Sequence, residues 1–248
     1  MNKVFVGVGA AAVVAAAAVA YLSARGSAPV APAAAISVTA NNPMGQSIDP
    51  KDPGEIQYKK GLYPEALAYW TDQAAKGNQQ AAHRLGVEYM DGKGGVVPGC
   101  NVARCPNYAK AMVYHKQAAL AGNALSMFDI GSIFEYGLGV TADLAQAEKW
   151  YGYSANYGLA QGQYNFATML ESGEGGHSPD LIESYKFFIL AARGGFTGIP
   201  YDNRNFKIDR NAPLPTDLLR HKMTPAQIEE ATERANAFKK IAGPLKGE

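Results

Sequence analysis

Four stretches of the chain carry small and aromatic residues at the spacing of one helix face. Each stretch places an alanine three residues before a glycine, an aromatic-rich pair eight and seven residues before it, and a small residue eleven before it. In a helix these positions lie on one side. Each stretch therefore predicts one helix, here called helix A, with the glycine as its C-cap. The glycines are Gly77, Gly122, Gly158 and Gly195.

A second helix, helix B, is predicted after each of the first three glycines. Apolar residues recur at equivalent positions there, and each copy then stops in a pair of glycines. The start of helix A is marked by Asn107, Asp143 and Asp180, which are suited to cap a helix N-terminus. The four glycines are 45, 36 and 37 residues apart. A period of this length indicates stacked antiparallel helix hairpins, so we expect an all-α, α/α solenoid.

One copy of the pattern resembles the Sel1-like repeat family, which is related to the tetratricopeptide repeats. The residues that carry the resemblance are Ser126, Ile130-Gly131, Phe134, Gly137-Leu138-Gly139-Val140, Asp143, Ala147, Trp150-Tyr151 and Ala155. The family's usual boundaries give about three repeats, at 79–122, 123–158 and 159–195, led by a helix A at 61–76. The resemblance implies a solenoid over residues 55–195 that binds other proteins.

Residues 196–248 do not follow the repeat. The stretch 196–222 is rich in proline, glycine and charge, and it is expected to be irregular and either packed on the solenoid end or functional. Thr224-Pro225-Ala226-Gln227 forms a capping box with proline at the first helical position. This predicts a C-terminal helix that runs to about Ala242 and caps the solenoid.

The N-terminal segment has the pattern of a targeting signal. Lys3 precedes Val4–Leu22, nineteen residues without a charge, and an Ala/Pro-rich stretch follows to residue 54. We expect residues 1–22 to be a signal peptide or an N-terminal membrane anchor, and 23–54 to be a flexible linker. Both alternatives stay open, and both place the repeats outside the cytoplasm.

Two cysteines, Cys100 and Cys105, lie in the stretch that lengthens the first period. A disulfide between them would close a short ring and is favoured over free or metal-bound thiols. Two thiols without a further Cys or His pair undersupply tetrahedral zinc. No metal or other cofactor is therefore expected.

Sequence motifs for catalysis are absent. The formal net charge of +1 does not favour nucleic acid, and the chain has no Gly-x-Ser-x-Gly, Walker, His-Glu-x-x-His or Ser-x-x-Lys motif. His115 occupies an aromatic position of helix A and is expected to be packed, whereas His177 is expected to be solvated. We therefore expect a protein that is not an enzyme.

A partner-binding surface is predicted on the side of helix A opposite the alanines. In related solenoids this side lines a concave groove. The expected contacts are Lys110, Gln117, Lys149, Tyr153 and Lys186, and Tyr153 and Leu190 are the informative members because solvent does not require apolar groups there. An ordinary solvated face is the alternative.

The N-terminal segment and the family resemblance together imply an exported or membrane-tethered protein-binding adaptor of a bacterial envelope. It would be periplasmic or otherwise exported, with residues 4–22 as a possible inner-membrane anchor and as its only membrane contact. The partner would be a protein of unknown identity, and no nucleic acid is expected. The alternatives are a periplasmic immunity protein that neutralises a secreted lipase-type toxin and, with less support, a β-lactam or peptidoglycan hydrolase.

Overall fold

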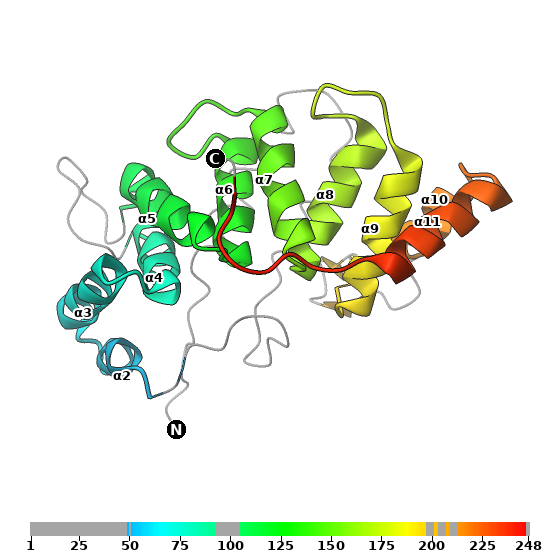
Figure 1. The fold of residues 1–248 in the computed structure, drawn as a ribbon. Coiled ribbons are helices and arrows are strands. Elements are labelled where there is room, and N and C mark those ends of the chain that lie inside the picture. The colour runs from blue at the N-terminus through cyan, green and yellow to red at the C-terminus, as the bar shows by residue number, and fades with distance from the viewer. Residues whose placement is uncertain are drawn as a thin grey trace.

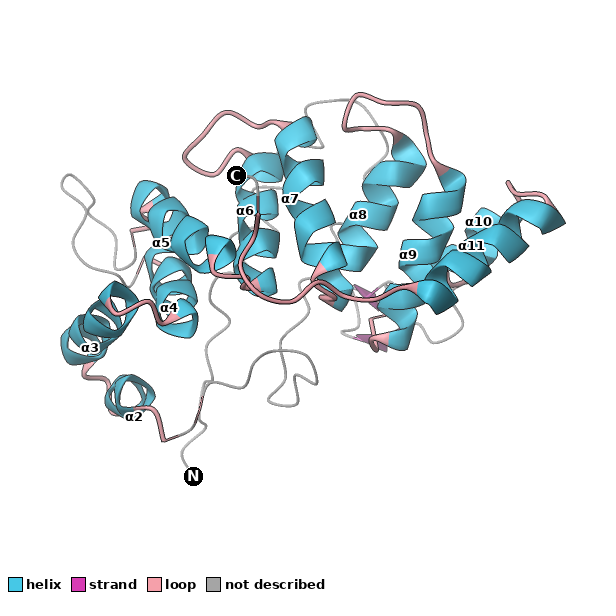
Figure 2. Cartoon of the chain, viewed as in Figure 1, coloured by secondary structure: helices cyan, strands magenta, loops and turns pink. Residues whose placement is uncertain are grey.

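The computed structural model describes residues 49, 51–92, 105–196, 201–202, 207–208 and 213–246. Residues 1–22, most of the expected linker, and Cys100 lie outside this part of the chain. The described helices form a curved row (Figures 1 and 2). Their bounds are α2 Pro53–Lys59, α3 Tyr63–Ala75, α4 Gln79–Met90, α5 Tyr108–Leu120, α6 Ala124–Tyr136, α7 Leu144–Asn156, α8 Ala160–Ser172, α9 Leu181–Arg193, α10 Pro215–Arg220 and α11 Pro225–Ala237.

The row is the predicted α/α solenoid. The A helices are α3, α5, α7 and α9, and the B helices are α4, α6 and α8, so α3 is the expected leading helix A. Each B helix packs most extensively on the A helix that follows it in the chain. Among the described residues the only strands are β1 (Tyr201–Asp202) and β2 (Lys207–Ile208), which form a two-residue antiparallel ladder in the irregular segment.

Both ends of the A helices follow the sequence pattern. Side-chain oxygens of Asn107, Asp143 and Asp180 each accept a hydrogen bond of 3.0 Å from the backbone N–H three residues later. The predicted glycines come directly after the C-cap residue, two residues past the last helical residue, with φ values between 82° and 97°. At Gly122, for example, the N–H donates to Ala119 O at 2.9 Å, which ends the helix in a left-handed turn.

Small residues bring the helices close together. The helix A alanines at the predicted core positions are fully buried or nearly so in α3, α5 and α7, whereas Ala192 of α9 is half-buried. Glycines of two B helices lie under rings of the next A helix: a Cβ on Gly86 would lie 2.6 Å from the His115 ring, and a Cβ on Gly131 would lie 2.6 Å from the Tyr151 ring. The large rings fill the space that the small residues leave, as in any close-packed interior.

The helices of the described chain begin slightly before the predicted boundary at residue 55, with α2 at Pro53. Asp52 caps α2 by accepting a hydrogen bond from Glu55 N, and it also accepts one from Trp70 Nε1 at 3.1 Å. Arg84 of α4 forms an ion pair with Glu55 at 2.8 Å. These contacts fasten α2 to the first repeat, so the last residues of the expected linker belong to the fold.

The C-terminal helix begins as predicted but ends earlier. The capping box of Thr224 and Gln227 is present, and Ala231 and Ala235 are buried against α9. The predicted end near Ala242 is wrong, because α11 ends at Ala237 and the chain continues in extended form. The reason is that the following residues bond to the solenoid rather than to their own helix: Ile241 N donates to Asn156 O at 2.8 Å and Leu245 N donates to Leu120 O at 3.0 Å.

Residues 238–246 are called the C-terminal tail below. Figure 1 shows the tail running from α11 back across the ends of the earlier helices towards α6. Within the residues that the structure places, no helix has the length and apolar character needed to cross a membrane.

Candidate functional site

The predicted contact residues lie on the A helices in two environments. Lys110, Gln117 and Lys149 are exposed, whereas Tyr153 and Lys186 are half-buried. Lys149 Nζ lies 5.8 Å from the centre of the Tyr153 ring, so these two side chains form a cation–π pair on α7. Tyr153 also packs edge-on against Trp150, with ring centres 5.5 Å apart. The structure thus brings Lys149 and Tyr153 together as one small surface.

Gln117 and Lys110 make contacts inside the solenoid. Gln117 Nε2 donates a hydrogen bond of 2.6 Å to Ala74 O, at the C-terminal end of α3. Lys110 Nζ lies 5.2 Å from the centre of the Tyr89 ring of α4. Both side chains therefore link their helix to a neighbouring one, although each stays exposed on its outer side.

The part of the predicted surface that lies on α9 is covered by α11. Leu190 was expected to be an exposed apolar residue, and that expectation is wrong: it is 8% exposed and packs in the same cluster as Ala231 and Ala235. Glu183 forms ion pairs with Lys186 at 2.8 Å and with Arg234 of α11. The physical reason is that the capping helix needs an apolar face to pack on, and α9 supplies it.

The tail lies along the C-terminal ends of the A helices, where they turn into the B helices. Its two backbone hydrogen bonds reach the last residue of α7 and the last residue of α5. Leu245 packs against the cluster that contains Trp150 and that Tyr153 also contacts. At the other end, the Phe238 ring lies 6.2 Å from that of Phe187. Residues of the predicted contact surface are therefore close to the tail.

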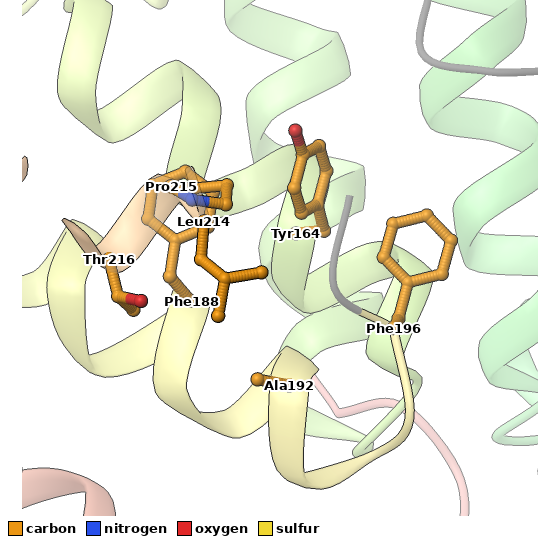
Figure 3. A pocket seen from close by; sticks show the side chains of 7 residues that line it. All are labelled: Tyr164, Phe188, Ala192, Phe196, Leu214, Pro215 and Thr216. Atoms are coloured by element: carbon orange, nitrogen blue, oxygen red, sulfur yellow. The ribbon is translucent and has the colours of Figure 1, made fainter. Parts of the chain in front are cut away.

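A small apolar cleft lies where the irregular segment meets the end of the solenoid (Figure 3). Its lining residues come from α8, α9, the turn after α9 and the start of α10: Tyr164, Phe188, Ala192, Phe196, Leu214, Pro215 and Thr216. Burial raises the pKa of Tyr164 above its usual value, so this hydroxyl stays protonated. Among the described lining residues Tyr164 is the one titratable group, and the cleft marks where α10 packs on the solenoid end.

A buried polar cluster lies between α4, α5 and α6. His83 Nδ1 and His115 Nδ1 each lie 3.4 Å from Asp129 Oδ2. The Ser126 hydroxyl lies 3.0 Å from His83 Nδ1 and 3.3 Å from His115 Nδ1. His115 and Ser126 are fully buried, which confirms that His115 is packed. The four residues are called the His83 cluster below.

Burial shifts the pKa values in the His83 cluster towards neutral side chains. Burial and the nearby Arg84 lower the pKa of His83 to about 4. Burial and the neighbouring His83 hold the pKa of His115 well below its usual value. Burial and the nearby Asp91 raise the pKa of Asp129 to about 7. In each case the low-polarity interior disfavours the charged form.

The His83 cluster is not a Ser-His-Asp catalytic triad. In a triad one ring nitrogen takes the serine proton while the other is held by the carboxylate. Here the same nitrogen, Nδ1, faces both Ser126 and Asp129 in each histidine. Sequence reasoning missed His83 as a site residue. It occupies a position of helix B that is aromatic in the other repeats, so comparing the repeats position by position could have identified it.

His177 lies apart from that cluster, in the loop after α8. Its exposed ring contacts Glu148 Oε2 through Nε2 at 2.7 Å and Ser178 O through Nδ1 at 2.7 Å. Both contacts favour the charged ring and raise the pKa of His177. The pair fastens the loop to α7.

Comparison with known families assigns the repeats. The Sel1 repeat pattern matches residues 79–123, 124–158 and 160–196. Residues 79–196 are Sel1 repeats. The matched boundaries agree with the predicted repeats to within one residue, and the α/α pairs between them are those of the fold described above. Sel1-repeat proteins mediate protein–protein interactions.

Individual relatives match part of the chain. The chain is 33% identical over 86 residues to the ERAD-associated E3 ubiquitin-protein ligase component HRD3 of Candida glabrata, which covers 35% of this chain and 9% of that protein. It is 27% identical over 128 residues to chitin synthase regulatory factor 3 of Schizosaccharomyces pombe, which covers 49% of this chain and 13% of that protein. A Sel1 repeat protein from Oxalobacter formigenes superposes with a TM-score of 0.51 at 25% identity, covering 57% of this chain and 54% of that one. The chain thus spans a small part of its curated relatives.

Proposed function

We propose that the protein is a non-enzymatic adaptor whose Sel1 solenoid binds an extended segment of a partner protein. The observation that carries this proposal is the position of the protein's own C-terminal tail. The tail has no regular secondary structure, and its Ile241 and Leu245 backbone N–H groups, four residues apart, reach helix ends in two successive repeats. A partner segment of the same form can make the same two hydrogen bonds.

The tail is held by few contacts, so a partner can displace it. Among residues 239–246 only Leu245 is even half-buried. Backbone hydrogen bonds at helix C-termini are worth about 1 kcal/mol each, and one partly buried leucine adds an amount of the same order. A partner with a larger apolar side chain at the Leu245 position would bind more strongly than the tail.

The partner surface continues onto α7 through Lys149 and Tyr153. These two side chains lie next to the cluster that receives Leu245. An aromatic ring with a lysine beside it suits a partner that places an apolar group and a carboxylate close together. The proposed adaptor therefore recognises an extended, partly acidic segment.

The experiment compares partner capture by two full-length variants that should change it in opposite directions. Ile241→Pro with Leu245→Asp removes one tail hydrogen bond and the tail's apolar anchor, and we expect it to retain more partner from an extract of the protein's own cells. Lys149→Ala with Tyr153→Ala should retain several-fold less. Lys60→Ala, on the exposed turn after α2, is the matched surface control.

Circular dichroism establishes that all three variants keep their helices. Equal capture by the two double variants and the wild type would contradict the proposed binding surface. If the tail variant captures more partner but the α7 variant does not capture less, the partner binds only where the tail binds. Lys149 and Tyr153 would then not belong to the binding site.

We further propose that the solenoid acts outside the cytoplasm of a bacterial cell, held by or released from the segment at residues 4–22. The support is the uncharged run after Lys3 and the proline-rich stretch that follows it. Cell fractionation followed by N-terminal sequencing tests this. Recovery of the uncleaved chain in the cytosol would contradict it, while an intact or cleaved N-terminus in the envelope distinguishes an anchor from a signal peptide.

A further inference from the structure

The repeat register shows that the His83 cluster replaces an aromatic pair. In every repeat one ring comes six residues after the turn glycine, on helix B, and packs on a ring seven residues before the next turn glycine, on helix A. The ring centres of the three pairs are 5.7, 5.4 and 5.3 Å apart. In order, the pairs are His83–His115, Phe128–Tyr151 and Tyr164–Phe188.

The polar neighbours of the histidines are also particular to this interface. Asp129 comes seven residues after its turn glycine, where the next repeat has Asn165. Ser126 comes four residues after the same glycine, where the next repeat has Gly162. Packing alone does not require these changes, because the same backbone arrangement in the next repeat is filled by Phe128, Tyr151 and neutral side chains.

Hydrogen bonds within the His83 cluster leave electron pairs unused. Both Nδ1 atoms face one hydroxyl, and the Ser126 hydroxyl has a single proton to donate. Asp129 Oδ2 is buried without a hydrogen-bond partner. A buried acceptor without a donor is costly, and two imidazole nitrogens and a carboxylate oxygen that converge are the donor set of a metal site.

The distances in the cluster fit a tetrahedral metal. Zinc bonds to histidine nitrogen and carboxylate oxygen are about 2.0–2.2 Å long, so two ligand atoms on one tetrahedron lie about 3.3–3.5 Å apart. Each histidine Nδ1 lies 3.4 Å from Asp129 Oδ2. Across the part of the chain that the structure places, this is the one group in which three such side chains bring ligand atoms within 4.8 Å of one another.

We propose that His83, His115 and Asp129 bind one divalent transition-metal ion, with zinc the best fit, between the first two repeats. The ligands are His83 Nδ1, His115 Nδ1 and Asp129 Oδ2, and the Ser126 hydroxyl or a water takes the fourth position. Two nitrogen ligands disfavour calcium and magnesium, which prefer oxygen. The ion would join α4, α5 and α6, one ligand from each, in a closed structural site that goes beyond the binding function proposed above.

The test uses the full chain purified without a histidine tag and stripped of metal with a chelator. Titration with Co²⁺ should give visible ligand-field absorption that saturates at one ion per chain, and Zn²⁺ should abolish it and raise the melting temperature. Asp129→Asn or His115→Gln should weaken Zn²⁺ binding by more than about 100-fold, beyond the roughly 10–100-fold that loss of an outer-shell partner costs.

Two controls separate this site from other metal ligands in the chain. His177→Gln removes an exposed histidine that pairs with Glu148 and should bind Zn²⁺ as the wild type does. Replacing both cysteines by serine should also leave binding unchanged. A variant with His83→Phe, His115→Phe and Asp129→Asn takes each new residue from the equivalent position of another repeat, namely Phe128, Phe188 and Asn165. It should therefore fold, as judged by circular dichroism, and bind no metal.

The proposal is overturned if the wild type binds no Co²⁺ or Zn²⁺. It is also overturned if binding persists in the triple variant, or if the cysteine replacement abolishes it. Binding that is unaffected by Ser126→Ala would assign the fourth position to water.

Discussion

The first and second repeat interfaces share one backbone plan and differ in chemistry. In the first, His83 packs against His115 over Gly86; in the second, Phe128 packs against Tyr151 over Gly131. Helix spacing is set by the small residues, and the rings only have to fill the remaining volume. The repeat therefore tolerates either an apolar or a polar filling at this position, and the polar one places titratable side chains deep in the molecule.

The second interface still contains polar atoms, but they are fully paired. The Tyr151 hydroxyl lies 3.0 Å from the Ser132 hydroxyl and donates to Glu135 at 2.6 Å. Burial and the neighbouring Glu135 raise the pKa of Tyr151 well above its usual value. Comparison of the two interfaces shows that burial alone does not make a site, because the first differs in having acceptors that no donor satisfies.

The largest expected effect is that of removing the second interface's central ring. Tyr151→Ala should lower the free energy of unfolding by about 3–5 kcal/mol, because it empties a fully buried ring position. In metal-free protein, His115→Ala should cost less, since it also removes buried polar groups that lack partners. Urea denaturation of both variants measures the difference. An equal or larger loss for His115→Ala would show that its polar contacts are as well satisfied as those of Tyr151.

A matched pair of glycine substitutions tests whether the two interfaces are equally tight. Gly86→Ala and Gly131→Ala each place a methyl group 2.6 Å from ring atoms of the facing helix. Overpacking of this kind costs about 1–3 kcal/mol, and we expect similar losses from both in thermal denaturation. A gain in stability at either position would mean that the helices separate easily there.

The pH dependence of stability should separate the two interfaces. Both histidine pKa values are lower in the folded protein than the usual value near 6.5, so the unfolded state binds more protons below about pH 6.5 and stability falls on acidification. Asp129 opposes this, because its raised pKa of about 7 makes the folded state take up a proton as the pH falls from about 7 to 4. The stability lost through the two histidines exceeds the stability gained through the one carboxyl group, so the net effect of acidification is a loss.

The measurement is urea denaturation at pH 6.5 and pH 5 in the presence of a chelator. The wild type should lose about 1–2 kcal/mol more than the variant with His83→Phe, His115→Phe and Asp129→Asn, in which these three positions no longer titrate. Parallel pH profiles for the two proteins would show that the histidines do not titrate across the unfolding transition.

The smallest effect is expected at the exposed histidine. His177→Gln removes an ion pair with Glu148 that water partly screens, so the loss should be below about 1 kcal/mol. The Ser178 carbonyl and Glu148 raise the pKa of His177, so its contribution is full below the unfolded value near 6.5 and is lost as the pH rises through the folded value. Denaturation at pH 6 and pH 9 measures it; a larger loss at pH 9 than at pH 6 would contradict the assignment.

The scaffold could be predicted from the sequence because the same structural residues recur in several repeats. The caps at Asn107, Asp143 and Asp180, the turn glycines and the alanine positions all follow from periodicity, and each is present. The end of α11 could not be predicted this way, because Ile241 and Leu245 bond to helices more than 80 residues earlier in the chain.

The site residues were less accessible to sequence reasoning. Leu190 lies on the predicted outer side of its helix, and only the docking of α11 makes it buried. His115 was expected in an aromatic position, but its meeting with His83 and Asp129 requires the packing of three helices. The register of the repeats contains this information once both ring positions are compared between copies.

The C-terminal tail also affects how the protein unfolds. A linear stack of repeats usually loses its ends first, because each unit touches only its neighbours. Here the tail after α11 is bonded to the last residues of α7 and α5, so the final helix is linked to earlier repeats by two backbone hydrogen bonds. Fraying of the C-terminal cap therefore also breaks these two bonds, which adds about 1 kcal/mol each to its cost and couples the cap weakly to distant repeats.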